Sequence, residues 1–516
     1  MQERAFSLEA RPVTEEWTHQ RTALLLLGIV VLALVLRFWR LGDWNFQATE
    51  MFTVRASDGP QFSNPRPLGY VLNYYLVRPF LPMNEFGLRL LPAIFGVLAI
   101  PALYVVIRRL IGTRAALFGT LFLAVSPLMV MYSQLARYWS LVFFFSAIYP
   151  YALYLGFRER RSGALTLGLV SGVLAALAHP VSVLLVAGPL AVLLMAQLRG
   201  RRLQDLWSHK SARWATLFLL IFASATALRF IPILQGWIAE HDQSPGSGQF
   251  LLRGQPPGLK QIFYVIAYVE SLTLPLVLVG TLGIYLMWRE RDRTLALFLG
   301  SVAIFPIVFL SLLSLRTPVS QYYLLPTAPV FFIGAGAFLD RLFEVDWKLP
   351  TRWLLPATVA ALVIVAGAPT LVSDYRDGRR FDFRGVAHWL EPQLGPGDAI
   401  FSDQPIVLAH YLPGREVQRL RIPAPLIQSV RELSQGGDGK ALWIVAPAPS
   451  HAFRTNLKRG GLINWIYDHC QLRNTLGKGR VDFRQQYLQV YRCAANDPGG
   501  DADAQSVGAR EGESEG

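Results

Sequence analysis

The chain has 516 residues, 53% of them hydrophobic and 16% charged, and its formal net charge is +14 at pH 7. A charge of this sign can indicate a nucleic-acid partner, but Arg and Lys fall mostly in short loops between apolar stretches, as they do in membrane proteins. Composition and charge placement therefore exclude a nucleic-acid-binding class, and we expect no nucleic acid among the partners.

Apolar stretches dominate the chain. About eleven of them lie between residues 22 and 372. A bilayer core of about 30 Å needs about 20 residues of helix, and these stretches are long enough. The sequence predicts a polytopic α-helical membrane protein with about 11 transmembrane helices over residues 22–372, followed by a small C-terminal extracytoplasmic α/β domain.

The N-terminal part is predicted to be a cytoplasmic leader, residues 1–21, followed by a first span over residues 22–39. This apolar run is too long for a cleaved signal peptide and has no small-residue cleavage site after it, so we expect it to remain as a span. A long outside loop follows, over about residues 40–89. Its prolines, asparagines and paired tyrosines, Tyr74 and Tyr75, predict short helices along the membrane interface.

Clusters of basic residues alternate along the chain and set the predicted orientation. Loops rich in Arg and Lys stay in the cytoplasm under the positive-inside rule. The basic loops contain Arg108, Arg109 and Arg114; Arg158, Arg160 and Arg161; Arg199, Arg201, Arg202, Lys210 and Arg213; Arg289, Arg291 and Arg293; and Arg341, Lys348 and Arg352. We therefore expect a multi-pass protein of the cytoplasmic (inner) membrane, in contact with membrane lipids, with its N-terminus inside and its C-terminal domain outside.

The later spans follow a less regular pattern. After spans over about 90–107, 115–131 and 139–157, an apolar hairpin over residues 164–198 is broken at His179 and Pro180. Further spans centre near residues 220, 278, 305, 331 and 363. A second long outside loop, about residues 232–260, is rich in Gly, Ser and Pro, so we expect it to be mobile and to close over a bound ligand.

Beyond Asp374 the apolar runs shorten to the length of strands, which predicts an α/β domain over residues 373–495. We expect strands at 399–401, 442–445 and 487–490 and helices at 386–394 and 457–469. Residues 496–516 have Val507 as their one large apolar residue, so they are predicted to be disordered. The two cysteines, Cys470 and Cys493, both lie in the outside domain, where they either form a disulfide or remain two buried thiols.

Three acidic residues of the first outside loop are the candidates for catalysis. Glu50 stands among apolar neighbours, which would raise its pKa or direct it toward a cationic partner. A carboxylate there can take a proton from an acceptor hydroxyl or amine, and Asp43 and Asp58 are its reserves. A structural ion pair of Glu50 with Arg55 or Arg89 is the alternative.

Basic and aromatic residues at the outer face are the candidates for substrate binding. His179 interrupts the apolar hairpin at its outer turn, and Arg137 opens a span where its guanidinium can grip a phosphate. A lone buried histidine, and an arginine that extends to the interface beside an aromatic belt, are the alternatives. The same ambiguity holds for four further cations, Arg229, Arg253, Lys260 and Arg316. No second His or Cys stands at a ligand interval from His179, so the sequence leaves the use of a divalent metal undecided.

Several segments recur in the same order as in one known family. They are residues 85–97, EFGLRLLPAIFGV, then Ser126-Pro127, Tyr132-Ser133-Gln134 with Arg137, and His179, together with residues 67–75, 322–326 and 382–384. Over nearly its whole length the chain thus resembles the C-type membrane glycosyltransferases, in the branch of the protein mannosyltransferases and aminoarabinose transferases. The resemblance adds Tyr132, Arg89 and Tyr322 to the candidates for substrate binding.

The resemblance implies transfer of a sugar from a polyprenyl-phosphate carrier to an extracytoplasmic lipid, glycan or protein, with inversion at the anomeric carbon. It also implies an Asp-Glu pair in the first outside loop, of which the aspartate is the usual catalytic residue. Here the pair reads Thr49-Glu50, and Leu135 replaces a glutamate that is common in related chains. These departures keep a second hypothesis open, a catalytically degenerate member that binds a lipid-linked sugar as a scaffold or partner subunit. A transporter fits less well, because the spans lack matched inverted halves.

Overall fold

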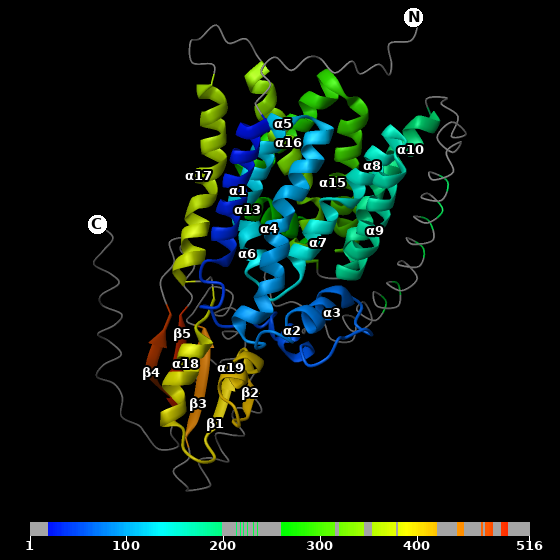
Figure 1. Ribbon diagram of the computed structural model, residues 1–516. Coiled ribbons are helices and arrows are strands. Elements are labelled where there is room, and N and C mark those ends of the chain that lie inside the picture. The colour runs from blue at the N-terminus through cyan, green and yellow to red at the C-terminus, as the bar shows by residue number, and fades with distance from the viewer. Residues whose placement is uncertain are drawn as a thin grey trace, which may run out of the picture.

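The computed structural model describes residues 19–198, 260–314, 319–344, 353–377, 380–420, 441–447, 466–467, 470–477 and 487–493, with isolated helical residues between 213 and 235. A bundle of helices forms the larger part of the molecule (Figure 1). A five-stranded sheet with helices beside it forms the smaller part, at one end of the bundle. The first outside loop lies at the junction of the two parts.

Six helical segments in the described part are long and apolar enough to cross a membrane. They are α1 (His19–Phe38), α4 (Glu85–Leu110), α7 with α8 (Trp139–Ser146, Tyr149–Glu159), α15 (Arg293–Leu313), η4 with α16 (Gln321–Thr327, Ala328–Glu344) and α17 (Leu354–Asp377). Two bent pairs raise the number to eight, α5 (Thr113–Val125) with α6 (Pro127–Ser133), and α13 (Lys260–Leu272) with α14 (Leu274–Leu286) and η3 (Met287–Arg291). The chain is a multi-pass membrane protein, but the 11 predicted spans are not confirmed.

Two features account for the smaller number of spans. The apolar hairpin over 164–198 forms shorter helices, α9 (Ser162–Ala178), η1 (Pro180–Val186) and α10 (Ala187–Leu198), because Pro180 has no N–H with which to continue α9. The span expected near residue 220 lies outside the continuously described residues. Pro127 separates α5 from α6 in the same way, at an angle of 59°.

Helices α14 and α16 approach each other so closely that their contact requires glycine. A Cβ atom added at Gly334 would lie 2.1 Å from the carbonyl oxygen of Gly280. Small residues of this kind let helix backbones pack directly against each other in a membrane. The contact fixes α16, which η4 precedes. Tyr322 and Tyr323 of η4 lie at the end of the bundle nearest the sheet, which we call the outer end.

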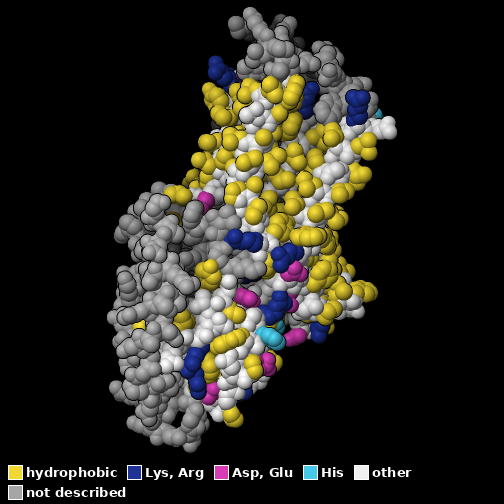
Figure 2. All heavy atoms as spheres, turned by 90° about the vertical axis from the view of Figure 1, so that its left-hand side faces the viewer, with side chains coloured by type: hydrophobic (Ala, Val, Ile, Leu, Met, Phe, Trp, Pro, Cys, Tyr) yellow, Lys and Arg dark blue, Asp and Glu magenta, His cyan; other side chains and the backbone are white. Residues whose placement is uncertain are grey.

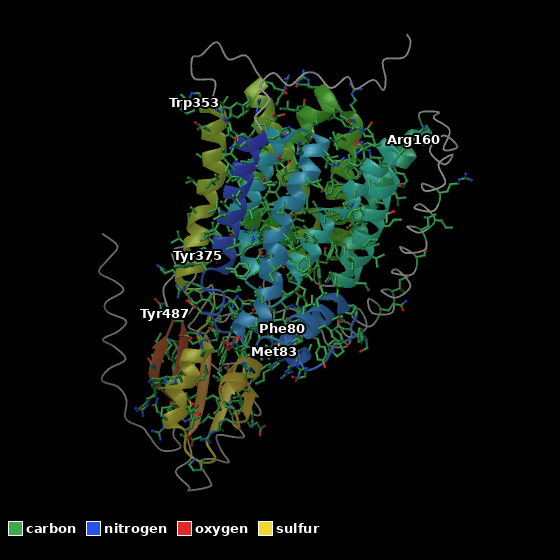
Figure 3. The ribbon with its side chains drawn as sticks, viewed as in Figure 1. Phe80, Met83, Arg160, Trp353, Tyr375 and Tyr487 are labelled. Carbon is green, nitrogen blue, oxygen red and sulfur yellow. A yellow bond between two sulfur atoms is a disulfide. The ribbon has the colours of Figure 1, made fainter. Side chains whose placement is uncertain are left out.

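The basic loops gather at the end of the bundle opposite the sheet. Arg160 and Trp353 lie at this end in Figure 3, whereas Tyr487 lies in the sheet at the other end. Three ion pairs join helix ends that are distant in sequence: Arg114 with Asp340 at 3.8 Å, Arg158 with Asp292 at 3.3 Å, and Arg341 with Glu290 at 2.7 Å. That this end faces the cytoplasm remains a prediction of the positive-inside rule.

Apolar side chains cover much of the bundle surface on the face that Figure 2 presents. In Figure 1 this face carries α1 and α17, whose apolar windows are only 17% and 22% buried inside the protein. Helices that expose so much apolar surface are stable in a bilayer, where lipid tails cover them. Charged side chains become frequent toward the sheet, below the apolar band.

The smaller part is a mixed sheet with strand order β2-β1-β3-β5-β4. The central strand β3 (Leu442–Pro447) pairs in parallel with β1 (Ala399–Ser402), which pairs in parallel with β2 (Val417–Arg419). On its other side β3 pairs antiparallel with β5 (Leu488–Cys493), and β5 with β4 (Cys470–Leu476). Helices α18 (Phe383–Leu390) and α19 (Pro405–Tyr411) pack on one face, and the short η5 (Glu391–Gln393) extends α18. All of β3 is buried, as in a central strand that is covered on both faces.

The strands expected at 399–401, 442–445 and 487–490 correspond to β1, β3 and β5. Strand β2 has three residues, and β4 is a partly exposed edge strand without apolar alternation, so neither gave a clear pattern. Cys470 and Cys493 form a disulfide between β4 and β5, with their Cα atoms 4.0 Å apart. The tail over 496–516 and nearly all of the helix expected at 457–469 lie outside the described residues.

Candidate functional site

The first outside loop leaves α1 at residue 39 and enters α4 at Glu85, and it holds the acids that the sequence singled out. Within it lie two short helices, α2 (Met51–Ala56) and α3 (Pro67–Leu76). Glu50 immediately precedes α2, and its side chain is fully buried. Its neighbour Thr49 is exposed. At the position of the expected acid pair, Thr49 therefore faces solvent, whereas Glu50 lies in the protein interior.

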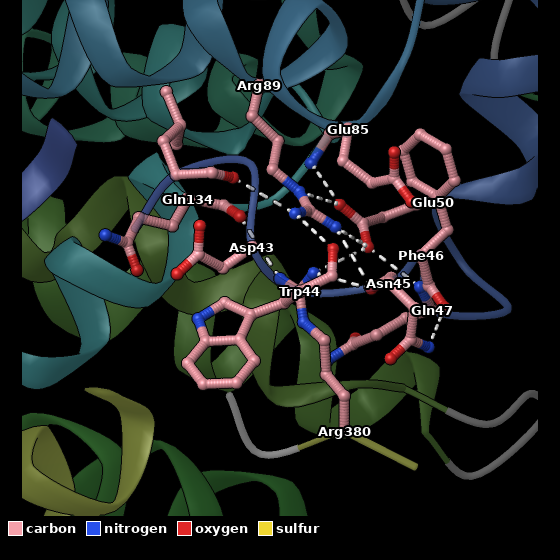
Figure 4. A network of polar contacts seen from close by, with 12 residues as sticks. Asp43, Trp44, Asn45, Phe46, Gln47, Glu50, Glu85, Arg89, Gln134 and Arg380 are labelled. Atoms are coloured by element: carbon pink, nitrogen blue, oxygen red, sulfur yellow. Dashed lines mark hydrogen bonds and ion pairs between the residues drawn. The ribbon is translucent and has the colours of Figure 1, made fainter. Parts of the chain in front are cut away.

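Both carboxylate oxygens of Glu50 accept hydrogen bonds (Figure 4). Oε1 accepts from Nε of Arg89 at 2.9 Å and from the backbone N–H of Ala136 at 2.6 Å. Oε2 accepts from Nη2 of Arg89 at 3.1 Å and from the N–H of Gln47 at 2.8 Å, and lies 3.2 Å from Nη1 of Arg380. We call Glu50, Arg89 and Arg380 the Glu50 cluster.

The remaining N–H groups of Arg89 donate hydrogen bonds to the backbone. Its Nη1 and Nη2 groups donate to the carbonyl oxygens of Leu41, Trp44 and Asn45 at 2.7–3.2 Å. The side chain is 0% exposed. No donor is left for a ligand, so these contacts favour a structural role for Arg89 over the predicted substrate-binding one, and the ion pair of Glu50 with Arg89 is present.

The guanidinium groups hold the pKa of Glu50 below its usual value. Burial by itself would raise that pKa, because a charge is costly away from water, but Arg380, Arg89 and the N–H of Ala136 outweigh burial. Burial lowers the pKa of Arg380 to about 10, which leaves it charged at neutral pH. Glu50 therefore stays ionised, and a carboxylate so fully occupied by donors is a weak proton acceptor.

Aromatic residues form a second group at the outer end of the bundle. His179, between α9 and η1, stacks on Trp139 with ring centroids 4.6 Å apart. Tyr322 and Tyr323 of η4 lie 4.9 and 6.0 Å from the same ring, and Tyr132 of α6 lies 6.3 Å from it. We call these five residues the aromatic cluster. It unites three of the predicted substrate-binding residues, His179, Tyr132 and Tyr322.

His179 is an uncharged hydrogen-bond donor. Its Nδ1 accepts from the N–H of Val181 at 3.1 Å, so the neutral ring carries its proton on Nε2. Burial, and then the charges of Arg66 and Arg137, hold the pKa of His179 well below its usual value. Within the described residues Nε2 has no hydrogen-bond partner. The buried ring therefore has one N–H without a partner among the described residues, within the electrostatic influence of two guanidinium groups.

Arg66 and Arg137 supply positive charge next to the aromatic cluster. Both are partly exposed, and in the part of the chain that the structure describes neither forms an ion pair. The guanidinium of Arg137 lies 5.6 Å from the ring centroid of Phe52. Phe52 and Thr49 are three residues apart on the turn that opens α2, so they lie on the same side of it, and both are exposed. Arg137 and Thr49 thus border the same open surface.

Arg137 belongs to a turn of residues 134–138 between α6 and α7, which we call the Arg137 turn. Gln134 donates through Nε2 to the carbonyl oxygens of Leu36, Arg37 and Trp39, which end α1. The N–H of Ala136 is held by Glu50. The ring of Tyr138 lies so close to Gly69 of α3 that a Cβ atom there would be 2.0 Å from Cγ. Contacts from α1, the loop before α2, and α3 therefore fix this turn.

The other predicted residues are placed less centrally. Asp43 is exposed and pairs with Arg40 at 2.7 Å, and Asp58 is exposed beside Arg78, which donates to its carbonyl oxygen at 2.6 Å. Arg229, Arg253, Arg316 and most of the loop over 232–260 lie outside the described residues, and the side chain of Lys260 is not described. No group of three or more His, Cys, Asp or Glu residues in the described ranges is placed to hold a metal ion.

Two cavities lie near these groups. The larger, of about 270 Å³, opens between the first outside loop and the C-terminal domain. Its lining consists of Phe46, Gln47, Ala48, Thr49, Arg380, Phe381, Phe383 and Gln404. The smaller, of about 10 Å³, lies beside Arg37, Tyr132 and Ser133 inside the bundle, with room for about one water molecule. Glu50, His179 and Arg137 lie at the same end of the bundle, but neither of these cavities is lined by all three.

Part of the chain matches the model of a known protein family. Residues 73–227 match the family model of the dolichyl-phosphate-mannose-protein mannosyltransferases. The predicted family resemblance is confirmed. The matched stretch includes Arg89, the Arg137 turn and His179. A sequence search of curated proteins finds no match.

Solved structures of two membrane proteins share the fold of most of this chain. ArnT from Cupriavidus metallidurans in the apo state is similar with a TM-score of 0.54 and 16% identity, covering 91% of this chain and 98% of that one. The same protein bound to undecaprenyl phosphate gives 0.54 and 16%, covering 92% and 99%. The archaeal oligosaccharyltransferase AglB from Archaeoglobus fulgidus, in complex with an inhibitory peptide and a dolichol-phosphate, gives 0.55 and 11%, covering 95% and 76%.

Sequence reasoning missed three residues of this site. Trp139, the centre of the aromatic cluster, directly follows the segment that singled out Arg137, so an aromatic residue beside a candidate cation was a usable signal. Arg66 stands between two prolines in the first outside loop, where a single cation at a helix start could have drawn attention. Arg380 gave no local signal, because its partner Glu50 is far away in sequence.

Proposed function

We propose that the protein is an integral membrane glycosyltransferase that moves a sugar from a polyprenyl-phosphate carrier to an acceptor at the outer face of the membrane. The family match over residues 73–227 supports the reaction class. One observation carries the proposal: Arg66, Arg137 and His179 lie near one another beside the aromatic cluster. This group is at the end of the bundle where the C-terminal domain lies. The acceptor is a lipid, a glycan or a protein.

The chemistry of this group suits a phosphate leaving group. In the transfer, an acceptor oxygen or nitrogen attacks the anomeric carbon, and the bond from that carbon to the carrier phosphate breaks. The released phosphate gains negative charge, which guanidinium groups and an N–H donor stabilise where charge develops. Arg66 and Arg137 provide the guanidinium groups, and Nε2 of His179 provides the N–H donor. The rings of Trp139, Tyr322 and Tyr323 provide an apolar wall beside the phosphate.

Glu50 contributes to this reaction by holding the Arg137 turn through the N–H of Ala136. Asp43 and Asp58, two exposed acids of the first outside loop, are then the candidates for the carboxylate that takes the acceptor's proton. Substitution of each by Asn separates them, because loss of a proton acceptor lowers kcat with little change in KM. Two variants with full kcat would remove both residues from the mechanism.

The proposal is tested by identifying and following the donor. Mass analysis of lipids that co-purify with the protein names the carrier and the sugar, and the isolated lipid then serves as donor in detergent or vesicles. We expect release of polyprenyl phosphate by the unaltered protein, and at least about a tenfold loss of rate in Arg137→Gln. Arg158→Gln, at the opposite end of the bundle, is the matched control and should retain the rate. An unaltered protein that neither binds nor consumes a polyprenyl-phosphate sugar would contradict the proposal.

A catalytically degenerate member of the family is the second candidate, and two observations favour it. Thr49 replaces the usual aspartate, and Glu50 beside it is fully occupied by donors. Such a protein would bind the lipid-linked sugar as a scaffold or partner subunit. Thr49 is exposed and lines the larger cavity, so Thr49→Asp adds a carboxylate without burying it. Transfer gained by this variant of an otherwise inactive protein would favour the second candidate.

A further inference from the structure

Arg380 reaches from the C-terminal segment into the outer end of the membrane domain. It follows α17, and 8% of the residue is exposed. Its Nη1 donates to the carbonyl oxygen of Asn45 at 3.0 Å and lies 3.2 Å from Oε2 of Glu50. Its Nη2 donates to the carbonyl oxygen of Gln134 at 3.1 Å. One guanidinium therefore joins the first outside loop to the Arg137 turn.

Apolar contacts across the same boundary form a continuous core. Phe46, Met51, Leu88 and Ala136 of the membrane domain pack in one cluster with buried residues of α18, α19, β1, β3 and β5. Met51 begins α2 and Ala136 lies in the Arg137 turn. A large apolar interface is expected to fix the relative position of two parts, whereas a small polar one would permit movement. The C-terminal domain and the candidate site thus share one core.

Polar contacts beside Arg380 connect the same elements. The hydroxyl of Tyr411 accepts from the N–H of Phe46 and donates to Oε1 of Glu85, both at 2.7 Å. Nδ2 of Asn45 donates to the carbonyl oxygen of Phe381 at 2.9 Å. Arg384 lies 3.4 Å from the same Glu85 oxygen. Arg380 is the member of this set that also contacts the Arg137 turn.

We propose that Arg380 is a positioning residue for sugar transfer, which holds the Arg137 turn against the first outside loop through Glu50 and Gln134. The inference rests on the proposed function, which assigns the donor phosphate to Arg137. It makes the C-terminal domain part of the transfer site, in addition to any role in acceptor recognition.

The contacts of Arg380 need a guanidinium. Its planar fork places parallel donors on acceptors from two separate segments, whereas the ammonium of lysine is a point charge on a flexible stem. In Arg380→Lys the positive charge near Glu50 is retained, and the carbonyl oxygen of Asn45 keeps its hydrogen bond from Arg89, but the carbonyl oxygen of Gln134 loses its guanidinium donor. Because a buried acceptor without a partner is unfavourable, the Arg137 turn should move to regain its hydrogen bonds.

The test compares Arg380→Lys with Arg415→Lys in the full-length protein. Arg415 belongs to the same domain and donates to the carbonyl oxygens of Gly395 and Leu394, away from the first outside loop. We expect Arg380→Lys to weaken binding of undecaprenyl phosphate about tenfold and to lower kcat about as much, since the turn carries the phosphate ligand. Arg415→Lys should stay within about twofold of the unaltered protein. Unchanged binding and kcat in Arg380→Lys would overturn the inference.

Hydrogen exchange distinguishes positioning from general loss of folding. In Arg380→Lys we expect faster exchange in residues 46–54 and 134–138 and unchanged exchange in the helices of the bundle. A general increase across the bundle would mean that Arg380 serves folding alone, and unchanged exchange in both segments would mean that it holds neither. Either result would contradict the inference.

A double-mutant cycle tests the route through Glu50. If Arg380 acts through Glu50, the combined loss in Glu50→Gln with Arg380→Lys should be smaller than the product of the two single losses. If the loss in the double variant equals the product of the two single losses, Arg380 does not act through Glu50. The two proposals also fail separately: an unaltered protein that does not bind undecaprenyl phosphate refutes the proposed function, while hydrogen exchange still reports whether Arg380 fixes the Arg137 turn.

Discussion

The arginines at the two ends of the helical bundle have different kinds of partners. At the basic end, Arg114, Arg158 and Arg341 pair with acids, and the paired side chains are 13–36% exposed. At the outer end, Arg89 and Glu50 are 0% exposed and the side chain of Arg380 is 5% exposed. Water still reaches the first set of pairs, whereas protein encloses almost all of the second.

This difference indicates that burial, more than the number of ion pairs, decides how much stability the protein loses when an arginine is replaced. An exposed pair contributes about 0–1 kcal/mol, because water and salt screen it. Removing one partner of a buried pair costs about 3–5 kcal/mol, because the remaining charge is left without compensation. The outer end should therefore depend on each member of the Glu50 cluster, and the basic end should tolerate the loss of single arginines.

The largest expected effect follows from Arg89→Met. This change leaves the buried carboxylate of Glu50 with one cation in place of two and leaves the backbone carbonyl oxygens of Leu41 and Trp44 without their donor, while that of Asn45 keeps Arg380. We expect the free energy of unfolding to fall by about 3–5 kcal/mol, measured by denaturant unfolding in detergent. Glu50→Gln in the same chain removes the uncompensated charge and should restore part of the loss. A double variant less stable than Arg89→Met alone would argue against charge as the cause.

The lowered pKa of Glu50 predicts that the outer end is sensitive to acid. A carboxyl group whose pKa is lower in the folded state stabilises the fold above its unfolded pKa, here about 4.5. That contribution is lost as the pH falls through the folded pKa. Between about pH 6 and pH 3, the unfolding midpoint of the unaltered protein should therefore fall more steeply than that of Glu50→Gln. Parallel curves would mean that Glu50 does not couple its proton to folding.

Much of the membrane part could be predicted from local patterns. Apolar length found α1 and α4, and the spacing of basic loops predicted that Arg114 and Arg158 lie at one end, where the structure places their ion pairs. The hairpin broken at Pro180 was predicted as two spans, and its helices are shorter than the length set for a span, so these two spans are not confirmed. The edge strand β4 was missed because its residues alternate in neither polarity nor burial.

The candidate site was predictable only in part. Glu50, Arg137 and His179 could be singled out because ionisable residues in outside loops need partners or functions. Their partners could not, since Arg380 comes from a distant segment and no local pattern indicates its contact with Glu50. The sequence left two outcomes open for Glu50, a raised pKa among apolar neighbours or a cationic partner. The second applies, because two guanidinium groups outweigh burial.

Arg137 extends the comparison to an arginine that forms no ion pair within the described residues. Arg137→Gln should change stability little and should weaken binding of undecaprenyl phosphate about tenfold, or about 1.4 kcal/mol, because the lost charge faces the proposed phosphate site. Native mass spectrometry of the detergent complex measures the binding. Arg78→Gln, in the first outside loop and beside Asp58, is the matched control. Equal losses in the two variants would indicate a general effect of loop charge.

The smallest effect is expected at the basic end, for Arg158→Gln. Asp292, the partner of Arg158, also caps α15 by accepting from the N–H groups of Thr294 and Leu295. These two bonds remain when Arg158 is replaced, so the free energy of unfolding should fall by no more than about 1 kcal/mol, and less at high salt. Asp292→Ala removes both the ion pair and the cap, which adds about 1 kcal/mol to the loss. If Arg158→Gln destabilised the protein as much as Arg89→Met, exposure would not distinguish the two ends.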